Sequence, residues 1–257
     1  PAVTNFDRRP LKKMLYFFDD QSNQRVLYNT FDVTSLVQKA ENTVGVLLGN
    51  GWYNQRDRTV EGCMWYDTPR LLCQLEIEYT DGSTELVVTD DSWKTTTGPL
   101  LHDAIFTGEE YDARLELDGW NRNGYKDSSW KKALLVRAPK GSLHAQLAPH
   151  EKIIRILQPV SCEQKDDSTY WYAFPEMISG WAHIKVQGNA GDRIKLRFVG
   201  EEKNDFGQVD LYTFRGGGVE QWEPRFTWHT FRYIEVISRQ VRMNKESLVA
   251  KVVHTDP

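Results

Sequence analysis

Residues 72–88 have the sequence LCQLEIEYTDGSTELVV. The first part, residues 72–79, alternates apolar and polar side chains with a period of two, which is typical of a half-buried β-strand. A second strand-like run, residues 84–88, follows Asp81 and Gly82. Asp-Gly between two such runs predicts a β-hairpin, because both residues tolerate the positive φ angles of a type I′ turn. This stretch therefore favours a β-rich fold.

Similar strand-like runs recur along the chain, and helical periodicity is weak throughout. They occupy residues 25–31, 43–48, 183–187, 193–198 and 231–237. Between two of them lies GNAGD at residues 188–192, a segment rich in turn-forming residues. Many short strands separated by turns predict an all-β protein made of antiparallel β-sandwiches of the jelly-roll or concanavalin-like kind.

A domain boundary is predicted near the middle of the chain. Residues 138–142, APKGS, are linker-like, and a second proline-containing segment follows at residues 148–150. A length of 257 residues accommodates two ordinary domains. We therefore expect one β-sandwich over residues 1–142 and a second over residues 143–257.

Composition excludes several classes of function. The net charge is −4 and basic residues are scattered, so the chain lacks the basic surface that nucleic-acid binding requires. No run of about 18 apolar residues predicts a membrane span. The three cysteines, Cys63, Cys73 and Cys162, have no CxxC spacing, which favours buried thiols over a disulfide framework or a zinc site.

Aromatic residues are abundant: nine Trp, eleven Tyr and eleven Phe. Aromatic faces fill β-sandwich cores and also stack on the apolar faces of sugar rings. The segment from Asn50 to Tyr53 suits a sugar site, because Gly51 lets the backbone approach closely and Trp52 offers a broad face. The alternative is that Trp52 and Tyr53 close one end of the sandwich.

The carboxylates are weaker candidates for a catalytic or sugar-binding site than the segment from Asn50 to Tyr53. Glu109 and Glu110 are adjacent, as are Glu201 and Glu202, and neighbours on a strand point to opposite faces, so neither pair forms a catalytic dyad. Asp112 and Arg114 can meet on one face. We interpret them as an ion pair that orients the loop from Gly108, with sugar contact as the alternative.

Several motifs occur together in the order found in one enzyme family. They are YNTFDVT (28–34), LGNGWY (48–53), DSWK (91–94), GEEYDAR (108–114), SGW (179–181) and EPRFTWHTFRYIEV (223–236). In this combination the chain resembles the N-terminal β domains of bacterial α-L-rhamnosidases, glycoside hydrolase family 78. The resemblance covers about residues 25–257 and rests on six motifs in register.

The resemblance implies a parent enzyme that hydrolyses terminal α-L-rhamnose with inversion. Its acid and base would lie in an (α/α)₆ barrel that follows these domains, so no catalytic residue is carried over to this chain. Some members bind rhamnose through calcium in a comparable domain, and Asp19, Asp20 and Asn23 have suitable oxygen ligands. The resemblance implies no cofactor other than calcium. A bacterial cytoplasm and a periplasm both remain open as the compartment.

Two other functions compete with this interpretation. The chain could be a stand-alone carbohydrate-binding module for rhamnose-like sugars, with Asn50, Trp52, Tyr53, Asp112 and Arg114 as its binding residues. It could also be a purely structural scaffold for the downstream barrel. The module predicts an exposed Trp52, whereas the scaffold predicts a buried one.

Overall fold

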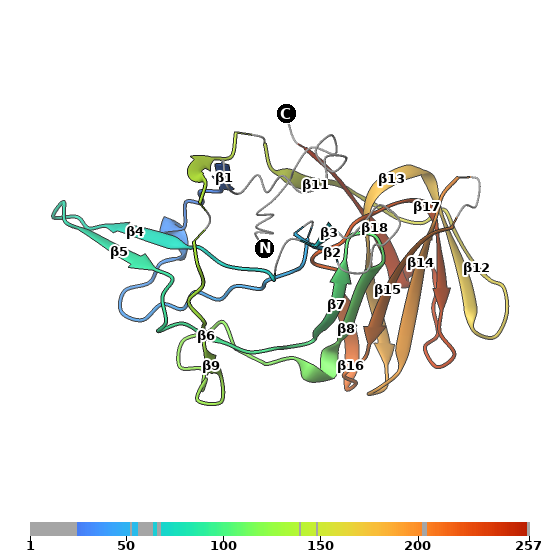
Figure 1. The fold of residues 1–257 in the computed structure, drawn as a ribbon. Helices are drawn as coiled ribbons and strands as arrows, with labels where there is room; N and C mark the ends of the chain where they lie inside the picture. Colours follow the sequence, from blue (N-terminus) through green and yellow to red (C-terminus); the bar gives the residue numbers. More distant parts are fainter. Residues whose placement is uncertain are drawn as a thin grey trace.

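The computed structural model describes residues 25–51, 53–55, 64–65, 68–138, 140–147, 149–201 and 205–255. Its largest feature is a curled sheet with the strand order β11-β18-β13-β17-β14-β15-β8-β7, to which β12 and β16 add by pairing with β13. It fills the right side of Figure 1. Its strands are β7 Leu100–Ala104, β8 Gly108–Asp112, β11 Glu151–Leu157, β12 Ser161–Gln164, β13 Thr169–Gly188, β14 Arg193–Val199, β15 Asp205–Thr213, β16 Gly218–Trp222, β17 His229–Ile237 and β18 Leu248–Thr255.

Strand β13 makes the sheet curl. It is 20 residues long, and its pairing register with β17 shifts between Ala173 and Ile178. Before the shift it pairs with β12 and β17; after the shift it pairs with β17 as far as Gly180, and from Gly180 onward with β18 and then β16. Such an irregularity bends a strand, so one strand contributes to two walls of the sandwich.

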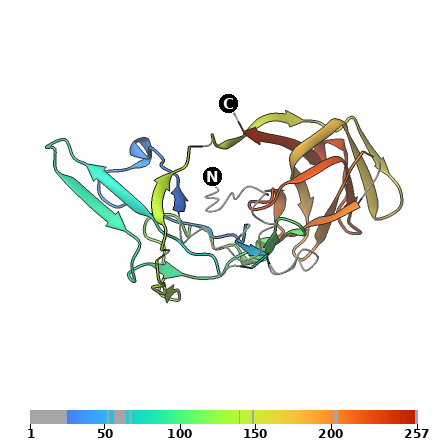
Figure 2. The ribbon, with the colours of Figure 1, turned by 45° about the horizontal axis from the view of Figure 1, so that its top comes forward.

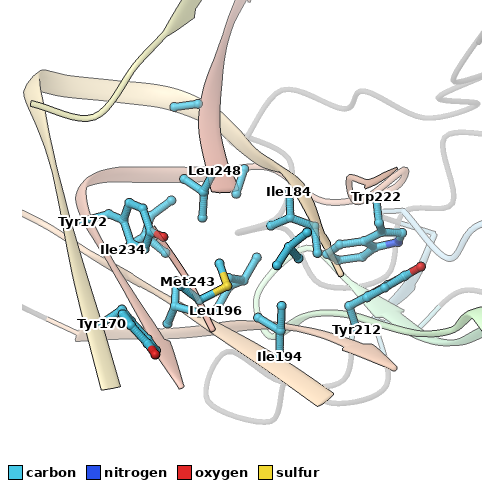
Figure 3. Close-up of a cluster of buried hydrophobic side chains, with 14 of the residues drawn as sticks. Tyr170, Tyr172, Ile184, Ile194, Leu196, Tyr212, Trp222, Ile234, Met243 and Leu248 are labelled. Carbon is cyan, nitrogen blue, oxygen red and sulfur yellow. The ribbon is translucent and has the colours of Figure 1, made fainter. Parts of the chain in front are cut away.

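The hydrophobic core lies inside this curl. Alternate residues of β13 are buried, as expected for a strand with one face in a core. The core side chains come from β13, β14, β15, β16, β17 and β18, with further side chains from β8 and from the segment that follows β17 (Figure 3). Those labelled there are Tyr170, Tyr172, Ile184, Ile194, Leu196, Tyr212, Trp222, Ile234, Met243 and Leu248.

The hairpin β7–β8 comes from the first half of the sequence but joins this sheet. Strand β8 pairs with β15 in parallel, with Leu211, Tyr212 and Thr213 opposite Glu110, Tyr111 and Asp112. Parallel strands cannot be joined by a tight turn, and here the paired segments are about a hundred residues apart in the chain. The first half of the chain thereby contributes one hairpin to the sheet of the second half.

The remaining strands of the first half, together with β10 just after the predicted boundary, form small sheets. Four two-stranded sheets pair β1 with β10, β2 with β3, β4 with β5 and β6 with β9. Figure 2 shows β4 and β5 extending away from the curled sheet. The bounds are β1 Arg25–Tyr28, β2 Asn54–Gln55, β3 Met64–Trp65, β4 Gln74–Glu78, β5 Thr84–Val88, β6 Lys94–Thr95, β9 Lys131–Lys132 and β10 Ser142–Ala145, with 3₁₀ helices at Thr34–Leu36, Ala113–Leu115 and Lys245–Ser247.

The predicted hairpin at residues 72–88 is confirmed, but its turn differs from the prediction. Strands β4 and β5 pair in antiparallel register, and the Tyr79 N–H donates to the Ser83 carbonyl. Only Gly82 takes a positive φ, of 81°, so the turn is not type I′. Asp81 instead accepts hydrogen bonds from the amide and hydroxyl of Ser83, which stabilise a longer three-residue loop.

The all-β fold class is confirmed, and most of the predicted strands are present. Residues 183–187, 193–198 and 231–237 lie in β13, β14 and β17. Residues 43–48 are an exception, since they pair with no strand within the described residues. Their β-branched composition indicates extended backbone, but a ladder also needs a partner strand.

Cys73 and Cys162 are free thiols but are half-buried, whereas the spacing predicted buried thiols; Cys63 lies outside the described residues. In the described part of the chain no helix has the length and apolarity to cross a membrane.

Candidate functional site

The segment around Asn50 is tied to strand β7. The Asn50 N–H donates to Asp103 Oδ1 over 2.7 Å, and its side-chain amide donates to the Asp103 carbonyl over 2.8 Å and to Asp103 Oδ2 over 3.1 Å. Asn50 Oδ1 accepts a hydrogen bond from the side-chain amide of Asn54. These bonds use the Asn50 donors, so this side chain fixes the position of the segment that leads to Trp52.

Asp103 begins a row of three buried carboxyl groups. Glu109 lies directly opposite it on β8, and opposite residues of an antiparallel pair face the same side. Asp210, on β15, accepts the Glu109 N–H through Oδ1 over 2.9 Å. Glu109 is 1% exposed, and Asp103 and Asp210 are likewise buried. Three neighbouring strands thus place one acid each in the interior.

Each acid has a defined set of partners. Glu109 Oε2 accepts the backbone N–H groups of Arg225 and Phe226, over 2.8 and 3.0 Å. Asp210 Oδ2 lies 2.9 Å from His229 Nε2. The His229 ring stacks on Phe198 with centroids 3.7 Å apart. The hydrogen bonds of this row therefore connect β8 and β15 to the first residue of β17 and to the segment just before it.

Burial sets the protonation of this row. Desolvation, together with the charges of Asp210 and Asp103, raises the pKa of Glu109 to about 8, and the N–H donors of Arg225 and Phe226 oppose this rise. Desolvation also raises the pKa of Asp103, while the Asn50 N–H opposes the rise. At neutral pH Glu109 is therefore mostly a neutral acid.

The residues that hold Glu109 belong to a short corner between β16 and β17, residues 223–228. At its start, Glu223 accepts hydrogen bonds from Lys251 Nζ and Trp181 Nε1, over 2.5 and 2.9 Å. Burial alone would raise the pKa of Glu223, but donors from His183, Lys251 and Trp181 lower it to about 2. One corner thus carries an ionised acid at one end and contacts a neutral acid at the other.

The corner also contacts the first half through a close approach. A Cβ atom built on Gly49 would lie 2.3 Å from the Phe226 ring, so only glycine fits there. Gly49 and Asn50 belong to LGNGWY, Glu109 to GEEYDAR, and Phe226 to EPRFTWHTFRYIEV. Three of the motifs that carry the family resemblance therefore meet at one junction.

Asp112 and Arg114 form the ion pair interpreted from the sequence. Arg114 Nε and Nη2 donate to Asp112 Oδ1 and Oδ2 over 2.9 and 2.6 Å, a two-pronged geometry. Asp112 also accepts the Arg114 N–H and caps a 3₁₀ helix. The side chain of Arg114 is 50% exposed.

Of the five predicted sugar-binding residues, the four that the structure describes lie at two places. Asn50 contacts Asp103 at the hairpin end of β8, whereas Asp112 and Arg114 lie at its other end, about 10 Å away by the rise of a strand. Tyr53 is half-buried and its N–H donates to the Asn50 carbonyl. Trp52 lies outside the described residues, so its predicted role stays a prediction.

The other carboxylates singled out from the sequence have structural partners. Glu110 lies 3.4 Å from Arg193, and Glu201 pairs with Arg232. Glu202 lies outside the described residues. Glycoside hydrolysis by inversion needs two carboxyl groups that open to a substrate and a water. The three acids of the row are buried and contact other groups of the protein, which suits a structural role.

Candidate metal ligands are few. In the ranges that the structure describes, no group of three or more His, Cys, Asp or Glu side chains is placed to hold a metal ion. The residues considered for calcium, Asp19, Asp20 and Asn23, lie outside those ranges.

Sequence reasoning missed Asp103 and Asp210 as partners of Glu109. The sequence signal available for Asp103 was the pair of short strand-like runs on either side of residues 105–107, since a hairpin there places Asp103 opposite Glu109. No local signal identifies Asp210, because it reaches Glu109 through a parallel pairing between distant segments.

Comparison with protein families assigns both halves of the chain. Residues 19–155 match the model of the α-L-rhamnosidase N-terminal domain, and residues 163–254 match that of the bacterial α-L-rhamnosidase concanavalin-like domain. An α-L-rhamnosidase of Formosa agariphila is 28% identical over 276 residues, covering 100% of this chain and 27% of that protein. One from Streptomyces avermitilis is 31% identical over 247 residues, covering 90% and 24%.

Solved structures agree with these matches. The α-L-rhamnosidase from Dictyoglumus thermophilum superposes with a TM-score of 0.83 at 36% identity, over 92% of this chain and 27% of that one. The Streptomyces avermitilis α-L-rhamnosidase complexed with L-rhamnose superposes with a TM-score of 0.79 at 29% identity, over 92% and 24%. The chain spans about a quarter of the length of the relatives it matches. On both sequence and structure, this chain belongs to the bacterial α-L-rhamnosidase family.

Proposed function

We propose that this chain supplies the N-terminal, non-catalytic β domains of an enzyme that hydrolyses terminal α-L-rhamnose from glycans or glycosides. The observation that carries the proposal is the match of two successive rhamnosidase domains to one chain. The described carboxylates support it, because Glu109, Asp112 and Glu201 are engaged in internal contacts. The acid and base would then be supplied by a downstream catalytic barrel.

The proposed domains are residues 1–142 and 143–257. The hairpin β7–β8 crosses from the first into the sheet of the second. The first domain would be the rhamnosidase N-terminal β-sandwich, and the second would support the barrel. Their junction at Glu109 would then fix the angle between them.

Hydrolysis of p-nitrophenyl α-L-rhamnoside tests this function. The purified 257-residue chain, with its intact mass verified, is expected to give no turnover above buffer. A longer rhamnosidase such as that of Streptomyces avermitilis serves as the positive control. Clear turnover by the chain at its verified mass would overturn the non-catalytic assignment, and Glu109, Asp112 and Glu201 would be substituted next.

Carbohydrate binding is a second candidate. A relative of similar fold was solved complexed with L-rhamnose, which supports a carbohydrate partner for the family. In this chain Asn50 holds the segment that carries Trp52, and Arg114 is half exposed beside Asp112. We place the sugar near Asn50, Trp52 and Tyr53, and a longer glycan would extend along β8 to reach Asp112 and Arg114 as polar partners.

Tryptophan fluorescence during titration with L-rhamnose tests this binding. The wild-type chain is expected to give a saturable change that Trp52→Ala removes and Trp130→Ala retains. The titration is run with calcium and with a chelator, so that a calcium requirement shows as loss of binding in the chelator. A response that survives Trp52→Ala would contradict the placement, and no response under either condition would favour the scaffold.

A further inference from the structure

The side of the curled sheet that faces away from the core carries an apolar surface on β11, β18 and β13. Ile156 and Trp181 lie opposite Lys251, one on each side of it, and opposite residues of antiparallel strands face the same way. Ala250 and Val252, the residues on either side of Lys251 in β18, are buried in the core. Because successive side chains of a strand alternate, Lys251 and the two residues opposite it point away from the core.

Two further pairs extend this surface along the strands. Ile153 lies opposite Val253, and Val249 lies opposite His183. A register shift follows Ile153, and the extra residue lets Ile153 and Ile156 point to the same side although they are three residues apart. We call this surface the outer face, and its apolar members are Ile153, Ile156, Trp181, Val249 and Val253.

The outer face is accessible to solvent although it is apolar. Ile153 is 46% exposed and Ile156 is 60% exposed. Trp181, Val249 and Val253 are half-buried. Single exposed apolar side chains are common on proteins, but a contiguous group of them marks a site of interaction. The outer face therefore has the properties of a contact surface.

The charged side chains of the outer face are already paired within this chain. Lys251 Nζ lies 2.5 Å from Glu223 Oε2, and Trp181 Nε1 donates to the same oxygen over 2.9 Å. The Lys251 side chain is only 16% exposed. Because the two charges compensate each other, the outer face fits the apolar surface of a folded protein better than a charged ligand.

The position of β18 and the length of the relatives point to one partner. Thr255, the last residue of β18, lies opposite Glu151, so a segment that continued from β18 would leave the sheet beside Ile153 (Figure 2). About three quarters of each rhamnosidase compared above lies outside the part that this chain matches. The matched part includes the N-terminal domain of the family. A following domain would therefore begin next to the outer face.

We propose that the outer face docks the catalytic part of the parent enzyme. This inference rests on the proposed function, because it takes these β domains to precede a catalytic barrel. An apolar surface of the barrel packs on Ile153, Ile156 and Trp181 and covers the ion pair of Lys251 with Glu223. The contact fixes the orientation of the barrel relative to the second β domain. A second copy of this chain is the competing occupant.

Hydroxyl-radical footprinting of the 257-residue chain and of the protein expressed from its complete coding sequence tests the docking. In the longer protein, Ile153, Ile156 and Trp181 are expected to be oxidised about fivefold more slowly, because the centre of a stable interface excludes water. Leu86, which is 53% exposed on β5, is the control and should be oxidised at the same rate in both proteins. Light scattering at several protein concentrations identifies self-association.

Ile156→Glu places a charge on the outer face, and Leu86→Glu is its matched control on β5. In the 257-residue chain, Ile156→Glu should change the melting temperature by less than about 2 °C, because its side chain is largely exposed. In the longer protein it should return the oxidation of Ile153 and Trp181 to the rate seen in the shorter chain, whereas Leu86→Glu should not. If Ile156→Glu fails to fold, the footprints of the two wild-type proteins decide.

Three results would overturn the docking. They are equal oxidation of the outer face in the two proteins, protection that rises with the concentration of the 257-residue chain, and a coding sequence that ends with this chain. Hydrolysis of p-nitrophenyl α-L-rhamnoside separates this failure from that of the proposed function. An active longer protein with an unprotected outer face contradicts the docking alone, whereas turnover by the 257-residue chain contradicts the proposed function.

Discussion

The two halves of the chain bury their apolar side chains very differently. In the second half, strands from both walls of the curled sheet share one core, in which Phe198 and Leu196 are fully buried. In the first half every side chain of β5 is exposed, and Leu86 is 53% exposed. The hairpin β7–β8 follows the second pattern despite its place in the sequence. Packing, and not chain order, therefore decides which segments form a unit.

The largest expected effect lies in the second half. Phe198→Ala should lower the free energy of unfolding by about 3–5 kcal/mol, because it leaves a cavity among packed aromatic rings. Phe198 stacks on His229 and makes an edge-to-face contact with Phe231. Urea unfolding followed by near-ultraviolet circular dichroism measures the loss. A loss below 1 kcal/mol would mean that this core is not the main source of stability.

A substitution in β8 tests whether the hairpin belongs with the second half. Gly108 has a φ of 108°, and an added Cβ would lie 1.9 Å from the Val209 carbonyl oxygen. Gly108→Ala should therefore cost about 3 kcal/mol in urea unfolding, the upper end of the usual range for overpacking. The control is Gly98→Ala, where the added methyl meets no atom within 4 Å. Equal effects of the two substitutions would contradict the docking of β8 on β15.

The decrease in the free energy of unfolding at acidic pH, the acid limb of the stability–pH profile, should depend on Glu223. Its folded pKa of about 2 lies below the ordinary value of 4.5. Its stabilisation is therefore complete above pH 4.5 and is lost as the pH falls toward 2. Glu223→Gln should cost about 1–2 kcal/mol at neutral pH and flatten this limb in thermal melts. A limb as steep as that of the wild type would assign the acid sensitivity to other carboxylates.

The Asp112–Arg114 pair should contribute less, because Arg114 is half exposed. Arg114→Ala is expected to lower the free energy of unfolding by less than Glu223→Gln does, and high salt should reduce that difference. Urea unfolding at two salt concentrations measures both effects. A loss larger than that of Glu223→Gln would show that the pair is much less accessible to solvent than the structure indicates.

The smallest effect is expected in the first half. Leu86→Ala removes a side chain that is largely exposed, and such changes usually stay within about 0.5 kcal/mol. Together with Phe198→Ala it measures the contrast between the halves directly. A loss comparable to that of Phe198→Ala would show that β5 is covered in solution.

The sequence predicted the elements better than their assembly. Alternation over residues 72–79 and 193–198 located strands correctly, because period-two patterns report directly on the two faces of a strand. The same reasoning assigned a strand to residues 43–48, which have no partner strand among the described residues. Local patterns cannot supply that partner.

The candidate site was predictable only where its contacts are local. Asp112 and Arg114 are two residues apart, and their ion pair follows from that spacing. Glu109 meets Asp210 and the N–H groups of Arg225 and Phe226 across more than a hundred residues. These contacts depend on the parallel pairing of β8 with β15, and no pattern within a short window encodes such a pairing.

Amide exchange over the whole chain at neutral pH tests most directly the claim that β7–β8 belongs to the second packing unit. We expect slow exchange in β13, β14 and β17, similarly slow exchange in β8, and fast exchange in β4 and β5. Exchange in β8 as fast as in β4 and β5 would contradict the claim. It would return the hairpin to the first half and leave the junction at Glu109 without its support.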